Sequence, residues 1–203
     1  MPYESLGSLK CLKWLPGTVH AELAAELLAD NHGFGERGVI KMYGKTYPFP
    51  RDQIMVRLPG GTNIPEYRYS GYDVPSRDAT ATEVKMFEVV RAAYRLHCQQ
   101  EFPAGYLLLN RYQNGQDGVG WHADDETHID QRYGIISLSV GTERDFLVRT
   151  KDGRHKWKIP LGNGDVAIMK AGMQATHHHC LPKRKNAHGT RLNYTFRVFK
   201  GAR

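Results

Sequence analysis

The sequence predicts a mixed α/β fold of the α+β type, with helices in the first half of the chain and short antiparallel strands in the second. Apolar residues recur at helical spacing in two stretches before residue 104, and they alternate with polar residues at a period of two after it. Short alternating runs separated by Gly, Asn and Asp are typical of sandwiches and jelly-roll barrels. The 203 residues fit one domain, which no linker or internal repeat divides.

Two segments predict helices. The first begins at Pro16 and ends at Gly33, and one of its faces carries Val19, Leu23 and Leu27. The second begins near Thr80, where Thr80 and Glu83 have the spacing of a capping box. Its apolar face consists of Met86, Val89, Val90, Ala93 and Leu96.

Six runs after residue 104 predict strands, because each is short and rich in β-branched or aromatic residues. Asp152 and Gly153 provide a hairpin turn between two of them. The predicted strands are 106–112, 133–141, 144–150, 156–161, 165–170 and 190–199.

The composition argues against a membrane or secreted protein. No apolar run reaches the 18 or so residues that a membrane span needs, and the N-terminus lacks the pattern of a signal peptide. The three cysteines are far apart and in no C-x-x-C pair, which disfavours a disulfide framework or a zinc ribbon. We therefore expect an intracellular protein of the cytoplasm or nucleus.

A net charge of +7 favours a polyanionic partner, nucleic acid first. Cations and flat aromatic rings are interleaved between residues 41 and 72, as in proteins that bind single strands or extruded bases. A tyrosine-rich sheet edge with arginine outside explains the pattern equally well. The residues are Lys41, Lys45, Arg51, Arg57 and Arg68, with Tyr43, Tyr47, Phe49, Tyr67, Tyr69 and Tyr72.

The stretch 120–126, GWHADDE, contains a candidate metal site. In extended chain His122 and Asp124 point the same way, whereas Asp125 points elsewhere. A third ligand can come from the histidine run 177–179, completing the two-histidine, one-carboxylate triad of iron(II) oxygenases. A solvated acidic turn is the simpler alternative for the stretch taken alone.

The C-terminal strand has one apolar and one polar face. Arg191, Asn193, Thr195 and Arg197 alternate with apolar neighbours. An ordinary half-exposed strand would show the same pattern. Arginines on the inner face of a small barrel would need an anion between them, because a buried unpaired guanidinium costs several kcal/mol. A dicarboxylate such as 2-oxoglutarate can supply that anion.

Together these residues resemble the AlkB-type 2-oxoglutarate and Fe(II)-dependent dioxygenases, which remove N-alkyl lesions from nucleic-acid bases. The resemblance implies a double-stranded β-helix (jelly-roll, cupin-like) core over 105–199, preceded by N-terminal helices and a nucleotide-recognition lid within 1–104. The core motifs follow the family's order and spacing, whereas the lid motifs match more loosely. The core motifs are LNRYQNGQDGVGWHADDE, ISLSVGTERDF, HHHCLP and RLNYTFR, and those of the lid are YGKTYPFPR and YRYSG.

The resemblance assigns residues to three roles. The iron ligands are His122, Asp124 and His179, which stands the family's twelve residues before Arg191. The residues expected to bind 2-oxoglutarate are Asn110, Tyr112, Arg191, Asn193, Thr195 and Arg197. The residues expected to contact substrate are Tyr43, Gly44, Lys45, Arg51, Tyr67, Arg68, Tyr69, Asp125 and Glu126.

The implied reaction is oxidative demethylation of bases such as 1-methyladenine and 3-methylcytosine in DNA or RNA. The reaction uses Fe(II) as cofactor and consumes 2-oxoglutarate and O2, and it releases formaldehyde, succinate and CO2. The expected partner is alkylated nucleic acid, and the expected state is a monomer. Three alternatives stay open: a zinc hydrolase, a non-catalytic nucleic-acid-binding barrel, and a protein side-chain demethylase of the same fold.

Overall fold

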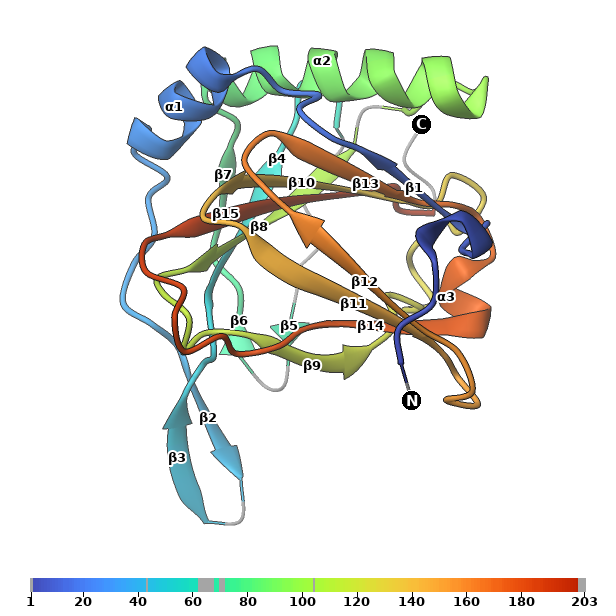
Figure 1. Ribbon diagram of the computed structural model, residues 1–203. Helices are drawn as coiled ribbons and strands as arrows, with labels where there is room; N and C mark the ends of the chain where they lie inside the picture. The colour runs from blue at the N-terminus through green and yellow to red at the C-terminus, as the bar shows by residue number, and fades with distance from the viewer. Residues whose placement is uncertain (1, 43, 62–67, 70–71, 104, 201–203) are drawn as a thin grey trace.

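Two facing β-sheets form the body of the protein in the computed structural model (Figure 1). The structure describes residues 2–42, 44–61, 68–69, 72–103 and 105–200. The larger sheet has, in spatial order, β1 (Leu12–Leu15), β13 (Asp165–Met169), β10 (Ile135–Gly141), β15 (Arg191–Arg197), β8 (Tyr106–Tyr112), β4 (Asp52–Arg57) and β7 (Ser76–Asp78). The smaller has β12 (Lys156–Leu161), β11 (Arg144–Thr150), β14 (His177–Leu181) and β9 (Val119–His122).

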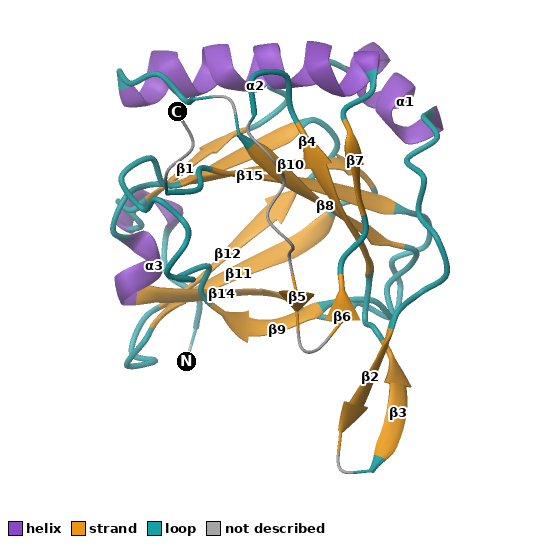
Figure 2. Ribbon diagram, turned by 180° about the vertical axis from the view of Figure 1, so that it is seen from behind, coloured by secondary structure: helices purple, strands orange, loops and turns teal. Residues whose placement is uncertain are grey.

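Two helices cover the outer face of the larger sheet, as both views show (Figures 1 and 2). They are α1 (Ala21–Ala29) and α2 (Ala81–Cys98). Apolar side chains of β15 pack beneath them, and the Phe196 ring stacks on Phe87 of α2 at 5.6 Å between centroids. Because successive strand residues point to opposite faces, the polar residues of β15 point between the two sheets. The sequence left two possibilities for the polar face of this strand, and the structure places it between the sheets.

The first helix is shorter than the sequence predicts. Residues 12–15 form strand β1, and Gly17 turns the chain with a φ of 60°, so Pro16 does not begin the helix. His20 is the N-cap, and its side chain accepts a hydrogen bond from the backbone N–H of Leu23. The chain leaves helical geometry at Asp30 rather than at Gly33.

The second helix begins as predicted, with both hydrogen bonds of the Thr80–Glu83 capping box present. Its buried face is rotated from the predicted one. Leu96 is 74% exposed, because it lies on the opposite side of the helix from Tyr94 and Cys98, which pack against the core. The residues that are buried are Glu83, Met86, Phe87, Val90 and Tyr94.

All six predicted strands form, but five strands of the two facing sheets were not among them: β1, β4, β7, β9 and β14. Strand β4 pairs with both β8 and β7 and is buried along almost its whole length. Its first two residues, Asp52 and Gln53, are polar, so the sequence shows only a short apolar run there and no clear strand pattern. The chain just before it had been interpreted only as part of a basic, aromatic segment.

Two hairpins lie at the end of the molecule away from α1 and α2 (Figure 1). Strands β2 (Val39–Met42) and β3 (Lys45–Pro48) form a ribbon that projects from the body, and β3 is exposed throughout. The second hairpin pairs β5 (Arg68–Tyr69) with β6 (Tyr72–Asp73). Two single turns, η1 (Leu6–Ser8) and α3 (Met173–Thr176), complete the described elements. No helix of the described residues is long and apolar enough to span a membrane.

Candidate metal and cosubstrate site

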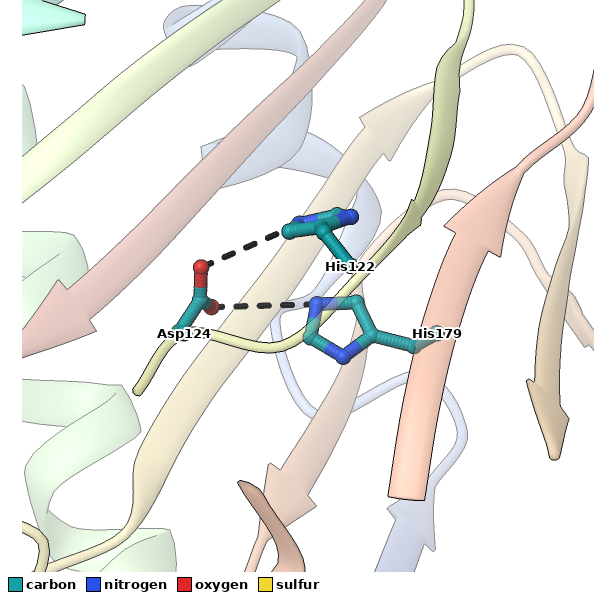
Figure 3. A group of neighbouring side chains, drawn as sticks. All are labelled: His122, Asp124 and His179. Carbon is teal, nitrogen blue, oxygen red and sulfur yellow. Dashed lines mark ion pairs between the residues drawn. The ribbon is translucent and has the colours of Figure 1, made fainter. Parts of the chain in front are cut away.

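Two histidines meet across a strand pair. His122 on β9 and His179 on β14 are direct cross-strand partners, so their rings lie side by side with centroids 4.3 Å apart. Asp124 follows just beyond the end of β9, and its carboxylate points at both rings (Figure 3). The carboxylate oxygens lie 3.8 Å from His122 Nε2 and 3.7 Å from His179 Nε2. Three ligand atoms, one from each residue, lie within 4.8 Å of one another.

The electrostatics of the group suit a bound cation. Burial opposes ionisation of Asp124, but Arg197 and the two histidines outweigh it and hold the carboxyl pKa below its usual value. Burial lowers the pKa of His179 to about 3, so its imidazole is neutral at pH 7 and keeps a lone pair. His122 Nδ1 lies 2.9 Å from the Gly120 carbonyl, an arrangement that leaves Nε2 as the free lone pair when Nδ1 carries the proton.

The neighbouring acidic residues lie outside this group, and for Asp125 this agrees with strand alternation. Asp125 is exposed and pairs with Lys151 at 3.3 Å. Glu126 is partly buried, and its Oε1 lies 3.9 Å from Arg197 Nη1. Of the preceding histidines, His177 packs on the Trp157 ring and on Cys11, away from the carboxylate. No other trio of His, Cys, Asp or Glu in the described chain converges in this way.

A cavity that is partly open to solvent extends from this group along the inner face of β15, from Arg197 to Arg191. Both sheets line it, so it occupies the space between them. From the larger sheet come Leu108, Asn110, Tyr112, Ser137, Met169, Arg191, Asn193, Thr195 and Arg197, and from the rest of the chain Arg51, Val119, His122, Asp124, Phe146, His179 and Leu181.

Arg191 and Arg197 stand in different environments. Arg197 Nη2 donates to Asp124 Oδ1 at 2.6 Å, so this guanidinium is held beside the carboxylate. Arg191 is 2% exposed, donates Nη2 to Ser139 Oγ at 2.8 Å and lies over the Tyr112 ring. Burial lowers the pKa of Arg191 to about 10. No carboxylate of the described residues pairs with Arg191, so the cavity wall presents a buried cation that an anion would stabilise.

The uncharged polar residues of the wall are held by one another. Asn193 Nδ2 donates to Ser137 Oγ at 2.8 Å, and Thr195 Oγ1 donates to Asn193 Oδ1 at 3.1 Å. Asn110 on β8 faces Asn193 in the strand register. These hydrogen bonds fix the shape of the floor between the two arginines.

Arg51 lies in the cavity wall rather than on an exposed lid. It is 6% exposed, and its Nε donates to Asn110 Oδ1 at 2.8 Å. Gln53 donates to the same oxygen at 3.1 Å. The sequence analysis missed Gln53, since it had not recognised β4. Period-two alternation from Arg51 would have placed both side chains on one face.

The other predicted substrate residues lie in the hairpins or outside the described chain. Gly44 and Lys45 are exposed on the projecting ribbon, where β3 begins. Arg68 and Tyr69 form β5, of which only the backbone is described. Tyr43 and Tyr67 lie outside the described residues.

Comparison with protein families matches residues 11–197 to the 2OG-Fe(II) oxygenase superfamily. The DNA oxidative demethylase ALKBH2 of Arabidopsis thaliana is 31% identical over 192 residues, covering 83% of this chain and 59% of the relative. Human ALKBH2 is 31% identical over 166 residues, covering 78% and 60%. The human alpha-ketoglutarate-dependent dioxygenase alkB homolog 3 is 39% identical over 101 residues, covering 45% and 35%.

Solved structures give the same fold. The structure of OsALKBH1 superposes with a TM-score of 0.58 at 20% identity, covering 92% of this chain and 97% of that one. The curated ALKBH2 relatives from Arabidopsis and human are longer proteins, and the matched region spans about three fifths of their length. The similarity therefore extends over most of this chain and part of those relatives.

Proposed function

The chain belongs to the 2OG-Fe(II) oxygenase superfamily, and we propose that it oxidatively demethylates N-alkylated bases in DNA or RNA. The observation that carries this proposal is the alignment of three features along one cavity. The His122–Asp124–His179 group lies beside Arg197, and Arg191, which has no carboxylate partner among the described residues, lies at the other end of β15, with Asn193 and Thr195 between the two arginines. The relatives named DNA oxidative demethylase support alkylated nucleic acid as the substrate class.

The donor set fits iron(II). Two imidazole nitrogens and one carboxylate oxygen on one side of a metal leave the other positions open, as in non-haem iron(II) oxygenases. His122, Asp124 and His179 would hold the ion. When bound, iron(II) with 2-oxoglutarate and O2 would supply the oxidising power to hydroxylate an N-methyl carbon, which is then lost as formaldehyde.

We assign 2-oxoglutarate to the wall formed by β8 and β15. Its far carboxylate would accept hydrogen bonds from Arg191, whose guanidinium is buried without an acidic partner in the described chain. Asn110, Tyr112, Asn193 and Thr195 would line the length of the molecule. Arg197 would keep Asp124 ionised and oriented, because its Nη2 already donates to that carboxylate.

The substrate enters beside His122 in this proposal. Among the three ligands, the His122 side chain is 30% exposed, whereas those of Asp124 and His179 are each 5% exposed. A base extruded from the strand could therefore stack on the His122 ring. The flanking nucleotides or the base itself would be held by Lys45, Arg68, Tyr69, Tyr43 and Tyr67. Asp125 and Glu126 would lie beside the methylated base.

Arg51 takes a different role in the proposal from the one expected of a lid residue. Its hydrogen bond to Asn110 links the chain leaving the projecting ribbon to the cosubstrate wall. A shift of the projecting ribbon on substrate binding would then be transmitted to Asn110 through the Arg51 side chain. We further propose that the protein acts as a monomer and that it acts inside the cell, where free cysteines such as Cys11, Cys98 and Cys180 are expected.

Product analysis tests the function. The protein, with iron(II) and 2-oxoglutarate, is incubated with DNA and RNA oligomers that contain 1-methyladenine or 3-methylcytosine. We expect formaldehyde and succinate in equal amounts and restoration of the unmodified base. A zinc hydrolase would release neither product, a binding barrel would bind the oligomer without turnover, and a protein demethylase would act on a methylated peptide instead.

A further inference from the structure

We propose that Gln174 and Gln131 are positioning residues that hold the backbone of Asp124 in place, so that its carboxylate stays aimed at the metal site. This inference rests on the proposed function of the site. Neither glutamine lines the cavity, and the carboxamide groups of both contact the backbone of Asp124 rather than its carboxylate.

The need for such a support follows from where Asp124 lies. Strand β9 ends at His122, so the backbone of Asp124 has left the hydrogen-bond ladder of the sheet. Asp124 is nevertheless 4% exposed, and a buried backbone N–H or C=O without a partner is costly. Both groups must therefore be satisfied by something other than a neighbouring strand.

Two glutamines satisfy them from different parts of the fold. The Asp124 N–H donates to Gln174 Oε1 at 3.0 Å, and Gln131 Nε2 donates to the Asp124 carbonyl at 2.8 Å. The two contacts hold the peptide groups on both sides of the Asp124 side chain. They restrict rotation of the backbone, which is the motion that would swing the carboxylate away from the two histidines.

The buried position of Gln174 suits it to this contact. It is 2% exposed, and its other polar atom, Nε2, lies 3.5 Å from the Met169 sulfur in the cavity wall. It lies in α3, the turn that leads directly into β14, five residues before His179. One segment therefore supplies a metal ligand and the acceptor that positions a second ligand, which ties the geometry of Asp124 to that of His179.

The inference predicts the effects of two matched substitutions. Gln174→Met keeps the length of the side chain and removes the acceptor, whereas Gln174→Glu keeps an acceptor oxygen at the same reach. Outer contacts of this kind change metal affinity by about 10- to 100-fold. We expect Gln174→Met to raise the Kd for Mn²⁺ by about tenfold or more, and Gln174→Glu to bind Mn²⁺ as tightly as the parent or more tightly.

Gln131→Met removes the second contact and should also raise the Mn²⁺ Kd. The experiment is calorimetric titration of the metal-free full chain with Mn²⁺ alone, with circular dichroism to verify that each variant is folded. Hydrogen exchange of the Asp124 amide provides a second readout, and it should quicken in folded Gln174→Met and stay slow in Gln174→Glu.

Each outcome decides between the alternatives. Unchanged Mn²⁺ affinity in folded Gln174→Met, or equal weakening in the Met and Glu variants, would overturn the positioning role and leave Gln174 as a packing residue. If Gln174→Met does not fold, the test rests on Gln131→Met and on the parent. Equal Mn²⁺ affinity in these two proteins, together with fast hydrogen exchange of the parent's Asp124 amide, would overturn the positioning role. A parent chain that binds no Mn²⁺ would remove the proposed function and this inference together.

Discussion

Replacing Arg191 with methionine should weaken 2-oxoglutarate binding while making the ligand-free protein more stable. The guanidinium is 2% exposed, and in the described chain its hydrogen-bond acceptor is the neutral Ser139 hydroxyl rather than a carboxylate. A cation held in this way favours an incoming anion, but it is unfavourable while the cavity is empty. Methionine keeps an unbranched apolar stem, is shorter than arginine and carries no charge.

The magnitude follows from the pKa. Burial lowers the pKa of Arg191 from 12.5 to about 10, which corresponds to about 3 kcal/mol of destabilisation of the cation in the fold. This cost is fully present below pH 10, because there the side chain is charged in both states. Arg191→Met also loses the hydrogen bond to Ser139, which reduces this gain in stability by about 1 kcal/mol. We therefore expect the free energy of unfolding of ligand-free Arg191→Met to rise by about 2 kcal/mol.

The opposite effect is expected once 2-oxoglutarate is present. Breaking a buried charge pair costs roughly 2–5 kcal/mol, so the Kd for 2-oxoglutarate should rise about a hundredfold. Urea denaturation with and without 2-oxoglutarate, together with calorimetric titration of the Mn²⁺-loaded protein, measures both quantities. Arg184→Met is the matched control, because Arg184 is exposed and pairs with Glu143 at 3.5 Å.

A stable Arg191→Met variant with the parent's 2-oxoglutarate Kd would refute the assignment of the far carboxylate. A variant that is strongly destabilised without ligand would refute the argument that the guanidinium is unfavourable in the empty cavity. Arg197→Met should behave differently, since it leaves the buried Asp124 carboxylate without its 2.6 Å partner. We expect that variant to lose about 3–5 kcal/mol of stability.

Three further predictions concern other parts of the molecule. Asp124→Ala should abolish Mn²⁺ binding, whereas Asp125→Ala should leave the Kd within about threefold, because Asp125 is exposed; equal losses by calorimetry would contradict strand alternation. Glu83→Gln should cost about 3 kcal/mol in urea denaturation at pH 7, since two hydrogen bonds from Arg77 help hold the Glu83 pKa at about 2 despite burial. That contribution is complete above the ordinary pKa of 4.5 and disappears as pH falls toward 2, so parent and Glu83→Gln should converge in acid. The affinity for an unmodified single-stranded oligomer, measured by fluorescence anisotropy, should fall with salt by a logarithmic slope of roughly 0.7 per phosphate contact, and a flat response would mean that exposed Lys183 and Lys185 do not contact phosphate.

The sequence predicted the site well where a local repeat determines the answer. Period-two alternation in 190–199 predicted that Arg191 and Arg197 share one face of β15, and alternation after His122 separated Asp124 from Asp125. These inferences need only the geometry of an extended chain. They hold because β15 lies in the middle of a sheet with helices on one side and a cavity on the other.

The parts that the sequence missed depend on contacts between distant segments. The pairing of His122 with His179 is a register between two strands whose paired residues are 57 positions apart in the sequence, and its assignment came from family resemblance. Gln174 gains its role only because α3 lies beside the end of β9. Leu96 fits the apolar stripe of the sequence and is nevertheless exposed, since the face that packs on the sheet also includes Glu83 and Tyr94 and is rotated away from Leu96.

A crystal structure of the chain with Mn²⁺ and 2-oxoglutarate tests the account most directly. The account predicts the ion between His122 Nε2, Asp124 and His179 Nε2, with 2-oxoglutarate lying along β15 and its far carboxylate paired with Arg191. An ion bound elsewhere, or 2-oxoglutarate with its far carboxylate away from Arg191, would contradict it.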